Sequence, residues 1–89
     1  MAATYSITIL PSAGKRIKRL KRLPVTVRQR AIDAIQELAH TPRPHGCKKL
    51  RDRDGYRIRV GEYRVIYTIK DAELVIIVVD VGHRRDIYT

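Results

Sequence analysis

Hydrophobic and polar residues alternate strictly in one short segment of the second half of the chain. Tyr56, Ile58 and Val60 occupy every second position, and Arg57 and Arg59 lie between them. Side chains of a β-strand point alternately to its two faces, so a period of two indicates a strand with one buried face. The segment 56–60 is therefore predicted to be a strand whose arginines point away from the core.

Two further strands are predicted after it, at Tyr63–Lys70 and Glu73–Val81. The pairs Gly61–Glu62 and Asp71–Ala72 separate the three segments, and two-residue turns join antiparallel neighbours. The last segment is apolar on both faces. This is typical of a central strand that is covered on both sides, or partly covered by a partner.

The first half of the chain predicts one strand and two helices. Thr4–Leu10 has strand composition, and Ser12 is a candidate N-cap for a helix over 13–22. Leu23–Pro24 ends that helix, and apolar residues at helical spacing predict a second one from about Val25 to Ala39.

A loop with two prolines follows at Thr41–Gly46, then a short strand at Lys48–Leu50 and a polar turn at Asp52–Gly55. The order strand, helical hairpin, β-meander predicts a single α+β domain over residues 1–89, with helices packed on one face of one sheet.

Charge is the strongest feature of the composition. The 89 residues include 19 Lys and Arg against 9 Asp and Glu, a formal net charge of +10. Such a charge attracts polyanions, which makes nucleic acid the first partner to consider. A basic protein whose charge only keeps it dispersed is the alternative, and an acidic protein partner is compatible with both.

Compartment signals agree with a cytoplasmic protein. Cys47 is the single cysteine, so no intramolecular disulfide can form, and Met1–Leu10 lacks the pattern of a secretory signal. The longest apolar run, Leu74–Val79, is far shorter than the roughly 20 residues that cross a bilayer. We therefore expect no membrane association.

Arginines gather on the polar face of the predicted meander. Arg57 and Arg59 share one face of their strand, and Arg64 lies across from them if the register allows. Like charges side by side destabilise a sheet, so the cluster is best explained by a polyanion that binds there. The alternative is a solvated face whose arginines pair with acidic residues.

A second basic surface is predicted on the first helix, where phosphates of ribosomal RNA can bind without sequence preference. A solvated helix surface is the alternative. Its residues are Lys15, Arg16, Lys18, Arg19, Lys21 and Arg22. His40, His45 and Cys47 lie in one loop, but no fourth ligand is evident, so no metal site is predicted.

Three ordered motifs carry a family resemblance: Tyr56–Val60, Gly61–Tyr67 and Val81–Tyr88. In this order after a strand and a helical hairpin, the sequence resembles the RelE family of the RelE/ParE toxin superfamily over about residues 4–88. The resemblance implies a microbial-RNase-like fold that enters the ribosomal A site and cleaves mRNA without metal or cofactor. It also implies a cognate antitoxin of the RelB kind. A charge of +10 and a doubly apolar last strand suit an acidic, partly disordered antitoxin segment.

The resemblance also implies which residues act on RNA: Arg57, Arg59, Arg64, Arg84 and Tyr88. Arg85, a further guanidinium in the same C-terminal stretch, is a candidate RNA contact. Attack of a ribose 2′-hydroxyl on its phosphate requires a base, stabilisation of the added charge and a donor for the leaving group. Guanidinium groups suit the second task.

The chain differs from the family in the residues available to act as the general base. Family members often have lysines where this chain has Arg57 and Arg59, and a guanidinium is a poor base because it hardly ever loses its proton at neutral pH. His83 and Tyr88 are therefore the better candidates for proton transfer. Two other functions stay open: a ParE-like toxin that inhibits DNA gyrase, and an RNA-binding module without catalysis.

Overall fold

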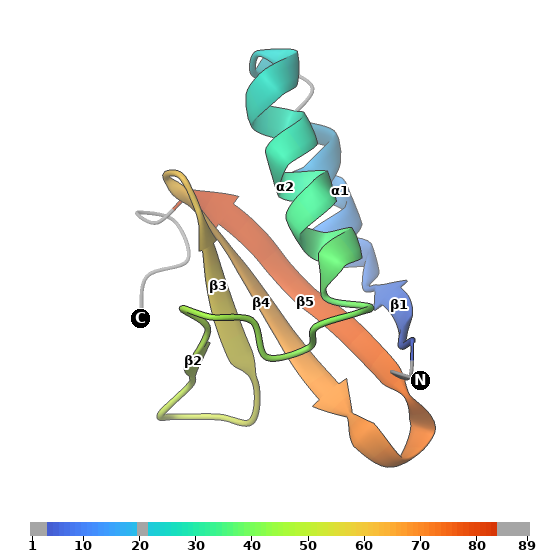
Figure 1. The fold of residues 1–89 in the computed structure, drawn as a ribbon. Coiled ribbons are helices and arrows are strands. Elements are labelled where there is room, and N and C mark those ends of the chain that lie inside the picture. The colour runs from blue at the N-terminus through green and yellow to red at the C-terminus, as the bar shows by residue number, and fades with distance from the viewer. Residues whose placement is uncertain (1–3, 20–21, 84–89) are drawn as a thin grey trace.

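The computed structural model describes residues 4–19 and 22–83 and shows an α+β fold, as predicted (Figure 1). Its helices and strands follow one another along the chain as β1 (Ser6–Ile9), α1 (Pro11–Arg19), α2 (Val25–Glu37), β2 (Lys48–Lys49), β3 (Tyr56–Val60), β4 (Tyr63–Lys70) and β5 (Val75–His83).

All five strands form one sheet in the order β1-β5-β4-β3-β2. The strands β2 to β5 pair antiparallel, whereas β1 pairs parallel to β5. A parallel pair needs a long crossover, and the helices and the meander between β1 and β5 provide it. The strand β5 therefore has a neighbour on each side, as its apolar sequence predicted.

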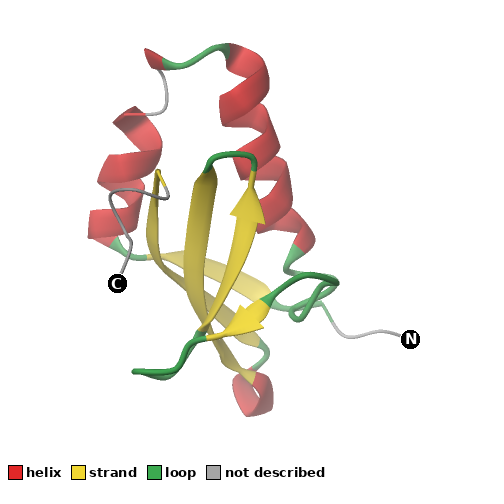
Figure 2. Ribbon diagram, turned by 90° about the vertical axis from the view of Figure 1, so that its left-hand side faces the viewer, coloured by secondary structure: helices red, strands yellow, loops and turns green. Residues whose placement is uncertain are grey.

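The two helices cover one face of the sheet (Figures 1 and 2). Helix α1 packs mainly against β5, and α2 contacts β3. Ala13 of α1 is fully buried, and its small side chain lets the helix lie close to the sheet. The largest fully buried side chains are Leu38, Val65, Tyr67, Ile76, Val78 and Val81. Neither helix in the described ranges is long and apolar enough to cross a membrane.

The β3–β4 hairpin has the predicted bounds. Gly61 begins its two-residue turn with a φ of 61°, a left-handed conformation that glycine adopts without steric cost. The next connection was predicted wrongly as a two-residue turn at Asp71–Ala72. Instead, Asp71–Glu73 form a 3₁₀ turn and Leu74 adopts a φ of 56°, so that β5 begins and ends two residues later than expected.

The prediction that Ser12 caps the first helix was also wrong. Helix α1 already begins at Pro11, and the Gly14 N–H donates to the Leu10 carbonyl. Proline suits the first helical position because its missing N–H would have no partner there. The Ser12 hydroxyl instead lies 3.5 Å from the Val79 carbonyl of β5.

Candidate nucleic-acid interface

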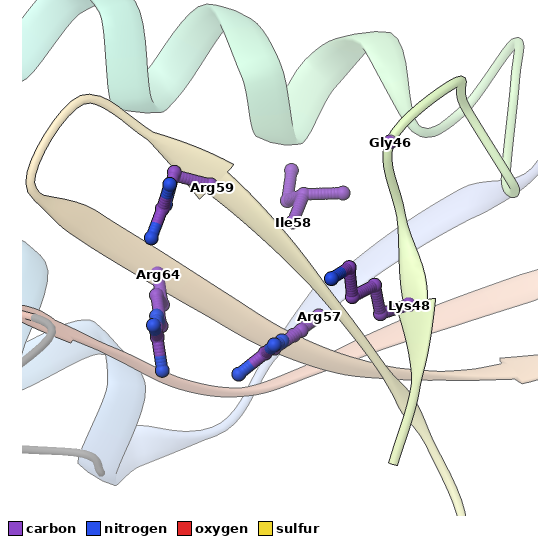
Figure 3. A pocket seen from close by; sticks show the side chains of 6 residues that line it. All are labelled: Gly46, Lys48, Arg57, Ile58, Arg59 and Arg64. Atoms are coloured by element: carbon purple, nitrogen blue, oxygen red, sulfur yellow. The ribbon is translucent and has the colours of Figure 1, made fainter.

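The strand register brings the three predicted arginines of the meander together. Arg59 lies directly opposite Arg64, and Arg57 lies opposite Ile66. Figure 3 shows these arginines pointing away from α2, while Ile58 between them points toward it. Ile58 is 8% exposed and belongs to the core. The predicted placement of the arginines on one face is therefore confirmed, and it follows from strand alternation.

A shallow pocket forms between these side chains, and it includes one residue that the sequence did not single out. The pocket is lined by Gly46, Lys48, Arg57, Ile58, Arg59 and Arg64. Lys48 enters because β2 pairs with β3 and places it opposite Arg57. A two-residue strand has no periodicity from which this pairing can be predicted, although the sequence did indicate a strand at this position.

The pocket continues over the polar turn into a second hollow. Lys48, Arg57 and Arg64 line both hollows, and the second adds Lys49, Leu50, Arg51 and Asp52. Its lining therefore carries five cationic side chains and one carboxylate. The open face of β2, β3 and β4 thus forms a continuous basic surface, which we call the arginine face.

The loop that leads from α2 to β2 is anchored by Arg43. Its guanidinium donates to both oxygens of Asp71, at 3.3 and 2.9 Å, and its Nε donates to the Tyr56 hydroxyl at 3.2 Å. The Tyr5 hydroxyl also donates to Asp71, at 2.7 Å. The Arg43 guanidinium, and then Tyr5, hold the pKa of the Asp71 carboxyl below its usual range.

A buried tyrosine of β4 also anchors the loop between α2 and β2. The Tyr67 side chain is fully buried, and its hydroxyl donates to the Pro42 carbonyl at 2.7 Å. Burial, reinforced by the neighbouring Cys47 thiol, raises the pKa of Tyr67 far above its usual range. Tyr67 therefore remains a neutral hydrogen-bond donor, and it ties the loop to the centre of the sheet.

The turn between β2 and β3 depends on a glycine. Gly55 has a φ of 133°, and a Cβ there would lie 3.0 Å from the Tyr67 carbonyl oxygen. The Leu50 N–H donates to the Gly55 carbonyl at 3.0 Å and closes the turn. These contacts fix how β2 approaches β3, and so they fix where Lys48 lies.

His83 lies on the other face of the sheet. It is the register partner of Tyr63, and the two rings meet edge to face at a centroid distance of 5.5 Å. Tyr63 follows the alternation of buried Val65, opposite to that of Arg64. His83 accordingly lines hollows on the helix side, with Leu23 and Val27. The structure does not bring this predicted proton-transfer residue to the arginine face.

The predicted basic face of α1 is present in part. Lys15, Lys18 and Arg19 are exposed, whereas Arg16 forms an ion pair with Asp80 of β5 at 3.1 Å. Arg22 is exposed as well. The remaining predicted site residues lie outside the described residues: Lys21, Arg84, Arg85 and Tyr88.

The chemistry of the arginine face suits phosphate groups. Guanidinium groups form paired hydrogen bonds with phosphate oxygens, and lysine adds a mobile point charge. Within residues 4–19 and 22–83, no group of three His, Cys, Asp or Glu side chains is arranged to hold a metal ion. The guanidinium and ammonium groups of this surface suit binding of a polyanion.

Solved structures with the same fold are toxins of toxin–antitoxin systems. The archaeal RelE–RelB complex from Pyrococcus horikoshii is 27% identical with a TM-score of 0.72 and covers 93% of this chain and 98% of that one. The Escherichia coli RelBE complex is 29% identical with a TM-score of 0.69, covering 89% and 95%. The RelBE2 complex from Mycobacterium tuberculosis, at 24% identity, a TM-score of 0.74 and coverage of 92% and 100%, shows the fold alone.

Sequence comparison gives one assignment. No curated protein sequence matches significantly. A family model described as the ParE toxin of the type II toxin–antitoxin system parDE matches residues 7–88, nearly the whole chain. Together with the fold, this match confirms the predicted superfamily: the chain belongs to the ParE toxin family and is a toxin of a type II toxin–antitoxin system.

Proposed function

We propose that this toxin is an endoribonuclease that cleaves mRNA in the ribosomal A site and so inhibits translation. The observation that carries the proposal is the arginine face, where Arg59 and Arg64 are direct cross-strand neighbours and Arg57 and Lys48 are another such pair. Two adjacent like-charge pairs destabilise a sheet. A bound polyanion would neutralise these like-charge pairs, which packing within the sheet does not explain.

The proposed reaction is attack of a ribose 2′-hydroxyl on the adjacent phosphorus. Negative charge grows on the phosphoryl oxygens in the transition state, and fixed cationic donors aimed at them lower the barrier. The guanidinium groups of the arginine face supply such donors without a metal or cofactor. Arg84 and Tyr88, which lie outside the described residues, complete the site by resemblance to the RelE family.

The proposed partners follow from charge. Ribosomal RNA and mRNA are polyanions that a chain of net charge +10 attracts, and exposed Lys15, Lys18 and Arg19 extend the basic surface beyond the arginine face. The antitoxin is proposed to be a RelB-like, acidic protein, because the E. coli and archaeal relatives are complexes with RelB. The proposed location is the cytoplasm, where ribosomes and mRNA are found.

The test is cleavage of mRNA on programmed ribosomes by the purified toxin. Variants Arg64→Ala, Arg84→Ala and Tyr88→Phe are compared with Lys70→Ala, an exposed residue at the far end of β4. Loss of one donor to the transition state should lower the rate about 10²- to 10³-fold, and Lys70→Ala should leave it unchanged. Absence of cleavage by the parent would refute the proposal. Salt-sensitive RNA binding without scission would instead indicate a non-catalytic module.

Inhibition of DNA gyrase is the second candidate function, because the matching family model is described as the ParE toxin. A shared fold does not fix the target. Supercoiling by gyrase should be measured with the same toxin preparation. Inhibited supercoiling together with intact ribosome-bound mRNA would reverse the ranking of the two functions.

A further inference from the structure

We propose that Lys48 is a further catalytic residue, the general acid that protonates the 5′-oxygen leaving group. This inference rests on the endoribonuclease function proposed above. It concerns a residue of the edge strand β2 rather than the arginines of β3 and β4.

Three structural facts place Lys48 in the site. It is the cross-strand partner of Arg57. It lines both hollows of the arginine face, together with Arg57 and Arg64. Figure 3 shows its side chain extending from β2 toward β3, beside Arg57. A phosphate held by the arginines would therefore lie within reach of a flexible ammonium group.

Lys48 also differs chemically from its neighbours. In the pocket of the arginine face, the other titratable side chains are guanidiniums, which hold their protons more tightly than an ammonium does. An ammonium therefore gives up a proton to a leaving group more readily than a guanidinium does. Lys49, Arg51 and Asp52 line the adjoining hollow and not this pocket.

His83 does not compete for this role. It packs against Tyr63 on the helix side of the sheet, whereas Arg64 points to the opposite side. Among the described residues that line the pocket of the arginine face, Lys48 is thus the best proton donor.

The proposed step balances in atoms and electrons. The 2′-oxygen forms a bond to phosphorus and its proton passes to solvent water, while the bond from phosphorus to the 5′-oxygen breaks. The 5′-oxygen keeps that electron pair and takes a proton from the Lys48 ammonium. The products are a 2′,3′-cyclic phosphate and a 5′-hydroxyl. The neutral amine then recovers a proton from solvent.

The experiment compares two leaving groups at the cleavage site of a ribosome-bound mRNA. One substrate has the natural 5′-oxygen, and the other has a bridging sulfur there, which leaves as a thiolate without protonation. Parent, Lys48→Arg and Lys48→Gln are measured on both. Lys70→Arg serves as the matched control, because it makes the same change at an exposed lysine of the same sheet, away from the pocket.

We expect Lys48→Arg and Lys48→Gln to cleave the oxygen substrate about 10²- to 10⁴-fold more slowly than the parent. Both should cleave the sulfur substrate as fast as the parent does. Lys48→Arg should also bind RNA with parental affinity, because the positive charge is kept. Lys70→Arg should match the parent throughout.

Two outcomes would overturn the inference while leaving the proposed function intact. One is parental cleavage of the oxygen substrate by Lys48→Arg, which would reduce Lys48 to a point charge. The other is an equal loss on both substrates, which would indicate a binding or structural role. A parent toxin that cleaves neither substrate would instead refute the endoribonuclease function, and this inference with it.

Discussion

Neutralising Arg59 should make the protein more stable and bind RNA less tightly. Arg59 and Arg64 are direct cross-strand neighbours, so their Cβ atoms lie about 5 Å apart. Like charges in this position destabilise a sheet by roughly 0.2–1 kcal/mol. Arg59→Gln removes the charge and keeps a long polar side chain on an exposed position. The free energy of unfolding should rise by that amount.

The same substitution should weaken RNA binding in a way that salt reveals. Each phosphate contact to single-stranded RNA contributes about 0.7 to the slope of log affinity against log salt concentration. Arg59→Gln should lower that slope by roughly this value. For the stability of the same variant, an increase of 1 kcal/mol in the free energy of unfolding corresponds to about 4–8 °C in the unfolding midpoint of a domain of this size. The expected increase should therefore raise the midpoint by roughly 1–8 °C.

Two measurements on one preparation test this reasoning: thermal unfolding without RNA, and binding of a short single-stranded RNA over a series of salt concentrations. Lys70→Gln is the control, since it removes the same charge from β4 outside the arginine face. It should change neither measurement appreciably. A midpoint that falls in Arg59→Gln, or a salt slope equal to that of the parent, would show that the arginine face is an ordinary solvated surface.

Three further predictions concern the contacts that hold β2 in place. Burial raises the pKa of Tyr67, so its contribution to stability is present below about pH 10, the ordinary tyrosine value, and is lost as the pH rises above it. In urea denaturation at a series of alkaline pH values, the free energy of unfolding of Tyr67→Phe should therefore fall less steeply with pH than that of the parent. At neutral pH, loss of the hydrogen bond to Pro42 should cost this variant about 1 kcal/mol. The pKa of Asp71 is lowered, so its contribution to stability is present above about pH 3.9 and is lost as the pH falls through the pKa of the folded protein. The free energy of unfolding of Asp71→Asn should therefore fall less on acidification than that of the parent. An equal fall in both proteins would contradict a stabilising ion pair between Asp71 and Arg43. Gly55→Ala should lower the free energy of unfolding by about 1–3 kcal/mol in urea, since its φ is positive and its new Cβ meets the Tyr67 carbonyl.

Local patterns were enough to predict much of this fold. The bounds of β3 and β4 follow from strict alternation and from a glycine turn, and these signals act over neighbouring residues. The arginine face follows from the same alternation, because a two-residue turn leaves little freedom in the register. The residues that the hairpin itself determines, Arg57, Arg59 and Arg64, were therefore found from the sequence.

Contacts between distant segments were not predictable in this way. Arg43 is anchored by Asp71 and Tyr56, which lie far from it in the sequence, and no local pattern of residues predicts these contacts. Lys48 was missed for the same reason, since its place depends on pairing between β2 and β3. The start of β5 was misplaced because Leu74 takes a left-handed conformation that is uncommon for a leucine.

The position of His83 and the need for Lys48 have one cause. A strand exchanges its two faces with every residue, so the register that places Arg64 on the open face sends His83, the partner of neighbouring Tyr63, to the helix side. No change of rotamer can bring that imidazole through the sheet. Among the described residues that line the pocket, β3 and β4 contribute guanidiniums, and the ammonium comes from Lys48 of β2. Its two residues add little to the core, but the Arg43 anchor, Tyr67 and Gly55 all act to hold it where Lys48 can reach a bound phosphate.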